Sequence, residues 1–241
     1  MIRIALFLAM LLSLPLFTAN YAVASDAVPV NATLKKQLLG APVYIQIFKQ
    51  ERKLELFAQL DGEFRLIGSY GICDFSGGLG NKRREGDFKS PEGFYNVDIH
   101  HLKPDSRFYR AINIGFPNAY DISQGYSGKY LMIHGNCKSI GCYAMTDGYM
   151  DEIFTYVQAA FQFGQRNLQI SIYPFKMTDA NMKAHKNSSY YSFWSQLQPG
   201  YAYFEKHHQP PNVVVTDGKY EVLQPLSNTP LSSQLAFAPM K

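Results

Sequence analysis

Charged residues are scarce in this chain: Asp, Glu, Lys and Arg together make up 17% of its 241 residues, and the formal net charge is only +4. No stretch gathers lysine and arginine into a long basic run, so the sequence lacks the electrostatic footprint of a nucleic-acid-binding protein. Hydrophobic residues at 46% argue against a disordered or fibrous chain. We therefore expect a packed globular body without a nucleic-acid partner.

Long hydrophobic runs are also missing. The most apolar stretch, residues 4–17, follows a single arginine and is interrupted by Ser13 and Pro15, so it falls short of the roughly 20 apolar residues that a membrane-spanning helix needs. A basic start, a short apolar run and the small residues at 22–24 are typical of a secretory signal peptide. We predict that residues 1–24 are removed on export and that the mature chain does not span a membrane.

Tryptophan occurs once, beside 17 tyrosines and 17 phenylalanines, a balance that favours strands and a groove over a helical bundle. Alternating apolar residues predict strands at 43–49, 54–60, 64–73, 94–99, 109–114, 129–133 and 168–175, and a closing hairpin at 213–223. An amphipathic helix is expected after Thr146, and a helical region over 178–198. We therefore expect a mainly β chain with flanking helices, an α+β fold. One domain is expected over 40–223, ending in a helical and hairpin extension, with a flexible tail at 224–241.

A long polar loop interrupts the predicted strands at residues 74–93, where Gly, Lys, Arg, Glu and Asp replace the apolar alternation. A loop of this length inside a compact domain is usually a binding or lid loop. No Gly-Lys-Ser or Gly-Lys-Thr triplet follows its glycines, which argues against a phosphate-binding loop.

Cysteine occurs only three times, at Cys73, Cys137 and Cys142, which is an odd number for an exported chain. A bridge between Cys73 and Cys137 would leave Cys142 free, whereas a bridge between Cys137 and Cys142 would suggest redox control. An inert buried thiol and an intermolecular bridge are further alternatives, because sequence alone does not give connectivity.

The neighbours of Cys142 distinguish it from the other two cysteines. The short segment 134–142 gathers an imidazole, a hydroxyl, two glycines and two thiols at the end of a predicted strand. A thiol attacks as thiolate and needs a base within hydrogen-bond reach, and His134 can supply one if Gly135 and Gly141 let the loop fold back. Backbone N–H groups around Gly141 and Cys142 would then face the developing oxyanion.

Three ordered segments carry a resemblance to a known family. Residues 85–95 contain Gly-Asp followed by Ser-Pro-x-Gly-x-Tyr, residues 112–121 lead into the strand before His134, and residues 139–145 have the sequence Ser-Ile-Gly-Cys-Tyr-Ala-Met. In this order they resemble the L,D-transpeptidases with a YkuD-type catalytic domain, and within that family the YafK-like branch. The resemblance spans about 43–175, and the region 194–220 is similar to the C-terminal part of that branch.

The resemblance implies a YkuD-type β-sandwich and a cysteine enzyme that acts on peptidoglycan in the periplasm. Cys142 corresponds to the nucleophile and His134 to the general base. The other expected site residues are Gly141, Ser139 and Tyr143 for the oxyanion or for positioning, and Gly135, Pro91 and Arg84 for substrate binding. Family members attack a diaminopimelate carbonyl of the stem peptide and form a thioester. An amine acceptor gives a cross-link or an attached protein, and water gives hydrolysis, which would release a peptidoglycan-linked lipoprotein. No cofactor is implied.

Two departures from the family pattern leave alternatives open. Ile140 and Ala144 stand where many members have a histidine and an arginine, so the stem-peptide carboxylate lacks its usual partner, for which Arg84 or a neighbouring cation on the long loop would have to substitute. A peptidoglycan-binding module without activity is one alternative. A zinc site at His134, Cys137 and Cys142 is another, weaker because the spacing lacks a Cys-x-x-Cys pair.

Overall fold

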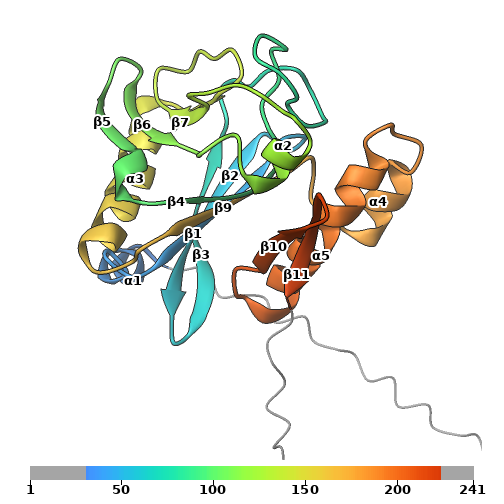
Figure 1. The fold of residues 1–241 in the computed structure, drawn as a ribbon. Helices are drawn as coiled ribbons and strands as arrows, with labels where there is room; N and C mark the ends of the chain where they lie inside the picture. The colour runs from blue at the N-terminus through green and yellow to red at the C-terminus, as the bar shows by residue number, and fades with distance from the viewer. Residues whose placement is uncertain (1–30, 224–241) are drawn as a thin grey trace, which may run out of the picture.

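The computed structural model describes residues 31–223, and the predicted signal peptide at 1–24 and tail at 224–241 lie outside the described residues (Figure 1). Its larger sheet contains five strands in the spatial order β3-β2-β1-β9-β4. The bounds of these strands are β1 Val43–Phe48, β2 Lys53–Leu60, β3 Glu63–Gly71, β4 Gly93–Val97 and β9 Leu168–Tyr173.

The first three strands, all predicted from the sequence, form an antiparallel meander. β1 pairs with β2 and β2 with β3, both antiparallel, and the β2–β3 turn is made by Asp61 and Gly62 with φ of 52° and 84°. Glycine and aspartate tolerate this left-handed region better than most residues. β9 then lies between β1 and β4, parallel to β1 and antiparallel to β4. β1 is consequently central, and all of its residues are buried.

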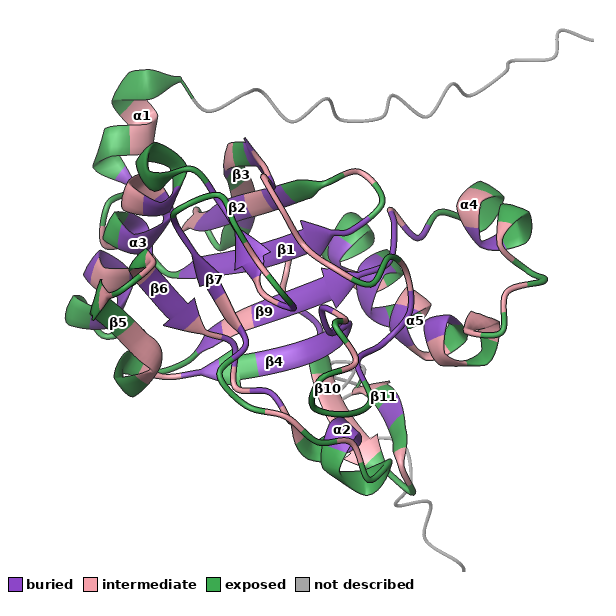
Figure 2. Cartoon of the chain, turned by 90° about the horizontal axis from the view of Figure 1, so that it is seen from above, coloured by how far each residue is buried: buried purple, intermediate pink, exposed green. Residues whose placement is uncertain are grey.

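A second sheet of four strands, in the order β5-β6-β7-β8, crosses above the first (Figure 2). The bounds are β5 Leu102–Ser106, β6 Tyr109–Asn113, β7 Met132–His134 and β8 Tyr143–Ala144. Ile45 and Ile170 of the larger sheet belong to the same buried cluster as Ile112 and Ile133 of the smaller one. The two sheets therefore share one core, and burial of this apolar surface is the main driving force for folding.

The helix α3, Asp147–Gln162, packs beside both sheets and begins one residue after Thr146, as predicted. The Thr146 hydroxyl accepts a hydrogen bond from the Tyr149 N–H at 3.2 Å, which satisfies one of the unpaired donors of the first turn. Ile153 and Val157 on its apolar face are fully buried. The shorter helical elements are α1 Ala32–Gln37, the 3-10 helix η1 Ile99–His101 and α2 Ala119–Ser123.

The chain after β9 forms an extension that covers one end of the larger sheet (Figure 1). It contains α4 Asp179–Ala184, α5 Tyr191–His207 and the antiparallel hairpin of β10 Asn212–Thr216 and β11 Lys219–Leu223. Trp194 and Leu197 of α5 pack into a second aromatic-rich cluster with Phe48 and Tyr173. The predicted helical region thus divides into two helices and continues beyond residue 198. No helix within residues 31–223 has both the length and the apolar character needed to cross a membrane.

Candidate active site

Two parallel strands position the predicted catalytic pair. His134 is the last residue of β7, Cys142 immediately precedes β8, and Ile133 pairs with Tyr143 in the parallel register. Extending this register by one residue sets Cys142 opposite Met132, which lies on the same face of β7 as His134 because side chains alternate along a strand. With strands about 4.8 Å apart and a rise of about 3.3 Å per residue, the α-carbons of His134 and Cys142 should lie about 8 Å apart. The fold therefore brings the thiol and the imidazole to one face of the sheet.

Both side chains line a cleft of about 490 Å³, together with Asp74, Arg107, Phe108, Tyr130, Lys138, Ser139 and Ile140. Arg107 and Phe108 come from the turn between β5 and β6. This turn lies near His134 because β6 pairs with β7 in antiparallel orientation. Its two cations against one carboxylate give the cleft a basic character, and its aromatic and aliphatic residues supply apolar walls. A larger cavity of about 750 Å³ between β4 and β10 is lined by neither His134 nor Cys142.

The tautomer of His134 follows from its hydrogen bond. Its Nδ1 lies 2.6 Å from the carbonyl oxygen of Gly135, and a carbonyl oxygen only accepts, so Nδ1 carries the proton. Nε2 is then the basic atom of the neutral ring. The ring lies against Phe108 with centroids 5.0 Å apart, and burial lowers the pKa of His134 from its ordinary value. A neutral imidazole that is ready to accept a proton is the result.

Cys142 is half-buried, and its Sγ lies 3.8 Å from the carbonyl oxygen of Tyr130. Burial raises the pKa of the Cys142 thiol, while hydrogen bonds from the Met132 backbone and Ser139 and the charge of Lys82 act in the opposite direction. Together with the lowered pKa of His134, this favours a neutral thiol and a neutral imidazole at rest over a preformed ion pair.

Ser139 braces the backbone of the nucleophile. Its Oγ donates to the Cys142 carbonyl oxygen at 2.9 Å and accepts from the Cys142 N–H at 2.8 Å, while its own N–H donates to Asp74 Oδ2 at 3.1 Å. The Cys142 N–H is thus already engaged and does not face the cleft as the sequence suggested. Gly141 has a φ of +97°, a left-handed conformation that favours glycine and that turns the chain into β8.

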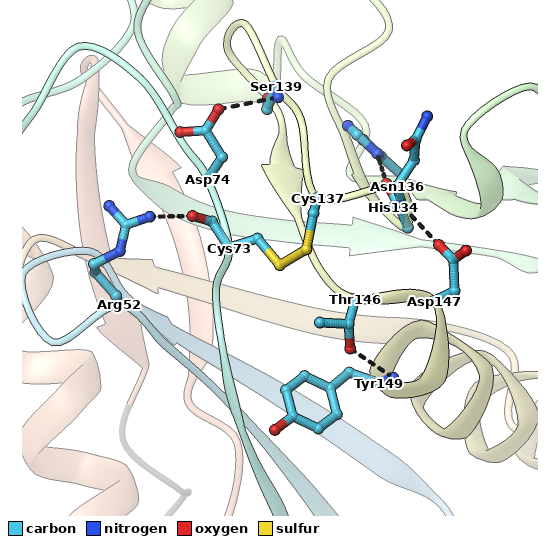
Figure 3. The surroundings of a disulfide bond; sticks show 11 residues. Arg52, Cys73, Asp74, His134, Asn136, Cys137, Ser139, Thr146, Asp147 and Tyr149 are labelled. Atoms are coloured by element: carbon cyan, nitrogen blue, oxygen red, sulfur yellow. Dashed lines mark hydrogen bonds between the residues drawn. A yellow bond between two sulfur atoms is a disulfide. The ribbon is translucent and has the colours of Figure 1, made fainter.

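A disulfide fastens the loop that carries the nucleophile. Cys73, just beyond β3, is bonded to Cys137 (Figure 3). Cys142 is the free thiol. The structure therefore selects one of the cysteine pairings left open by the sequence. Next to the bridge, the Asn136 N–H donates to Asp147 Oδ1 at 2.7 Å, and the Cys137 N–H donates to a carbonyl oxygen of residue 145 at 3.0 Å. The loop is held from both sides.

Besides Gly141, four other predicted site residues do not line the cleft. The Tyr143 ring is fully buried and its hydroxyl donates to the Pro91 carbonyl oxygen at 2.6 Å, so these two residues hold the long loop to β8. Gly135 is also buried, and a Cβ there would lie 2.6 Å from Asp147 Oδ1. Arg84 is exposed; its carbonyl oxygen accepts from Lys82 Nζ at 2.9 Å, and its N–H donates to Asp87 Oδ2 at 3.1 Å.

The zinc alternative has no geometric support. Cys137 is consumed by the disulfide, and within residues 31–223 no three His, Cys, Asp or Glu side chains group as metal ligands. Sequence reasoning missed Asp74, Arg107 and Phe108 in the cleft because they come from segments remote in sequence from residues 134–142, and it missed Tyr130, just before β7, because its position suggested only a strand residue. Recognition of β5 would have given a signal, since it makes Arg107 the tip of a hairpin beside β7.

Comparison with known proteins agrees with this geometry. The L,D-transpeptidase catalytic domain, YkuD, matches residues 42–163, which include His134 and Cys142. The protein named "Putative L,D-transpeptidase YafK" of Escherichia coli strain K12 is 58% identical over 236 residues, which cover 97% of this chain and 96% of that protein. Its counterpart of the same name in Escherichia coli O157:H7 gives the same values.

Among solved structures, the helical cell shape determining protein Pgp2 from Campylobacter jejuni shares 17% identity and covers 73% of each chain, with a TM-score of 0.46. Bd1075 of Bdellovibrio bacteriovorus shares 17% identity over 73% of this chain and 77% of that chain, with a TM-score of 0.40. The match to the catalytic domain and the identity to YafK over nearly the whole length decide the assignment: this chain belongs to the L,D-transpeptidase family with a YkuD catalytic domain.

Proposed function

We propose that this protein is a peptidoglycan-acting cysteine acyltransferase that attacks a diaminopimelate carbonyl of the stem peptide and forms a thioester on Cys142. Membership of the L,D-transpeptidase family supports a role at peptidoglycan. The observation that carries the mechanism is the shared cleft of Cys142 and His134, in which the hydrogen bond to Gly135 leaves Nε2 as the basic atom. A nucleophile and an oriented base are the two groups that acyl transfer requires.

The reaction is balanced by these two side chains. Sγ of Cys142 bonds to the carbonyl carbon as its proton passes to Nε2 of His134, and the carbonyl oxygen becomes an oxyanion. The tetrahedral intermediate then collapses, the C–N bond breaks, and the leaving amine takes the proton from His134. An acceptor amine that attacks the thioester gives a cross-link or an attached protein, with the thiol regenerated. Water in the same position gives a free carboxylate, and this hydrolysis would release a peptidoglycan-linked lipoprotein.

The charges of the cleft support a stem peptide as substrate. Diaminopimelate carries a carboxylate and an amino group at its side-chain end, and the cleft contains Arg107, Lys138 and Asp74. Within residues 31–223 neither Arg107 nor Lys138 forms a salt bridge, so both cations are open to a ligand. We assign carboxylate binding to Arg107, whose guanidinium can form a bidentate pair, in place of the arginine that Ala144 replaces.

Export to the periplasm is part of the proposal. The basic start, short apolar run and small residues within 1–24 support a signal peptide. The disulfide between Cys73 and Cys137 supports the same location, because disulfides persist in oxidising compartments. A tag fused after residue 241 and fractionation of the cells test this: the protein should be recovered in the periplasmic fraction in a form shorter than the full chain.

The test of the function is incubation of the purified protein with sacculi that carry bound lipoprotein and, separately, with free muropeptides, followed by mass analysis of the products. Cross-linked muropeptides indicate transfer, and released lipoprotein indicates hydrolysis. Cys142→Ala should abolish both, together with the covalent adduct on residue 142. Binding to sacculi without turnover or adduct by the unaltered protein would contradict the proposal and favour a binding module. Full activity of Cys142→Ala would also refute it.

A further inference from the structure

A buried ion pair lies beneath the long loop 74–92. The side chains of Lys49 and Glu92 are both 0% exposed, and Lys49 Nζ lies 2.9 Å from Glu92 Oε1. Charged side chains are almost never fully buried unless they are paired, and desolvation of both charges outweighs their attraction unless further hydrogen bonds satisfy them. The remaining partners of this pair therefore show what it holds in place.

Those partners are the two arms of the loop. Lys49 Nζ also donates to the carbonyl oxygens of Gly80 at 3.0 Å and Ser90 at 2.9 Å, so its three protons have three acceptors. Glu92 Oε1 also accepts from the Gly80 N–H at 2.7 Å, and the Glu92 N–H donates to Asn81 Oδ1 at 2.9 Å. The pair thereby ties the outgoing arm of the loop at Gly80 to the returning arm at Ser90.

The second oxygen of Glu92 is bound from the C-terminal extension. Trp194 Nε1 on α5 donates to Glu92 Oε2 at 2.8 Å. Trp194 is 2% exposed and packs edge-on against Phe175, so its indole is fixed. Residue 194 lies beyond the stretch 42–163 that matches the catalytic domain. Without this donor, a buried carboxylate oxygen would be left unsatisfied, which is costly for a charged group.

The returning arm then contacts the nucleophile itself. The Ser90 hydroxyl donates to the Cys142 carbonyl oxygen at 3.3 Å, and the next residue, Pro91, accepts from the Tyr143 hydroxyl at 2.6 Å. The backbone of Cys142 is thus held by Ser139 from its own loop and by Ser90 from the clamped loop. A continuous series of hydrogen bonds therefore runs from Trp194 on α5 through Glu92, Lys49 and Ser90 to the backbone of Cys142.

We propose that Trp194 is a positioning residue for Cys142: by binding Glu92 it holds Ser90 and Pro91 against the nucleophile, so that one hydrogen-bond donor of the C-terminal extension helps to position the reactive residue. The effect of Trp194 on turnover rests on the proposed cysteine chemistry. Its effect on the position of Cys142 does not, because the rate at which a small reagent alkylates the Cys142 thiol is independent of the natural substrate. Cys142 is the single free thiol of the described chain, so alkylation reports on it alone.

The test compares Trp194→Phe, which keeps an aromatic ring and removes the N–H, with Leu197→Ala. Leu197 is fully buried on the same helix and belongs to the same cluster, so its truncation controls for simple loss of packing. Both variants are measured below their urea unfolding transitions for the pH dependence of Cys142 alkylation by iodoacetamide and for turnover on muropeptides.

For Trp194→Phe we expect the alkylation midpoint to move to higher pH, because a displaced Cys142 loses the hydrogen bonds that stabilise its thiolate, and turnover to fall by about 10- to 100-fold. Leu197→Ala should keep the unaltered profile. Ser90→Ala, which removes the contact with the Cys142 carbonyl oxygen, should change the profile in the same direction and decides the matter if Trp194→Phe does not fold. An unaltered profile in folded Trp194→Phe or in Ser90→Ala would overturn the proposal. If the alkylation profile shifts in these variants but the unaltered protein has no activity on any muropeptide, the result would support the positioning role of Trp194 and count against the proposed function.

Discussion

Removal of the disulfide between Cys73 and Cys137 should cost stability and disorganise the nucleophile loop at the same time. The bridge joins residues 64 positions apart. A cross-link over a loop of that length lowers the entropy of the unfolded chain by an amount worth about 4 kcal/mol at 25 °C. The double variant Cys73→Ala, Cys137→Ala measures this directly, because it leaves Cys142 as the single thiol and so prevents mispairing.

Urea unfolding of the double variant, followed by circular dichroism, should show a loss of about 4 kcal/mol in the free energy of unfolding. Turnover should fall under conditions in which the variant is still folded, because Cys137 anchors the segment that leads to Ser139 and Cys142. Cys142→Ala is the control, since it removes a thiol without touching the bridge and should change the unfolding free energy little. A loss below about 1 kcal/mol, or unchanged turnover, would refute the view that the bridge constrains the unfolded chain and orders the site.

Four further predictions follow from the site. Since burial raises the pKa of Cys142 above its ordinary 9.0, alkylation should still be accelerating as the pH rises through 9, and a midpoint below pH 7 would instead indicate a preformed thiolate. Since burial lowers the pKa of His134 from its ordinary 6.5, the base stays neutral at pH 7, and turnover should be lost only as the pH falls below 6.5; loss of activity between pH 8 and 7 would contradict this. Ser139→Ala removes both hydrogen bonds to the Cys142 backbone and should cost about 1 to 3 kcal/mol in urea unfolding and most of the turnover, whereas Ser139→Thr retains the hydroxyl and should keep more of both. Arg107→Ala should raise KM for stem peptides with a free diaminopimelate carboxylate and not for amidated ones, while Arg84→Ala should leave KM unchanged; the opposite result would return carboxylate binding to the long loop.

Local patterns were sufficient for most strands and for the helix after Thr146. The alternation of Val43, Ile45 and Ile47 predicts β1, and the hairpin of β10 and β11 follows from its Asp-Gly turn, where Asp217 and Gly218 have φ of 47° and 70°. The insertion of β9 between β1 and β4 was not predictable. A strand buried on both faces has a continuous apolar pattern, and this pattern does not indicate which strands pair with it.

The site divides in the same way. His134, Ser139 and Cys142 lie close together in sequence, so their chemistry could be inferred before their geometry was known. Asp74 and Arg107 reach the cleft through tertiary contacts that leave no local signal. The buried pair of Lys49 and Glu92 runs against the ordinary expectation that charged residues are solvated, and the structure satisfies it with hydrogen bonds from distant segments.

The central place of β9 constrains the order in which an emerging chain can fold. Ribosomal synthesis delivers the chain from its N-terminus, so residues 73, 137 and 142 emerge before Leu168. Until β9 arrives, β1 and β4 each lack the neighbour that lies between them, and the larger sheet cannot close. We therefore expect the choice among the three thiols to be open while the fold is unfinished, so that an oxidant acting before β9 is in place would pair Cys142 with Cys73 or Cys137 in part of the molecules. On this view, correct maturation of the nucleophile depends on the relative timing of thiol oxidation and the arrival of the last strand of the larger sheet.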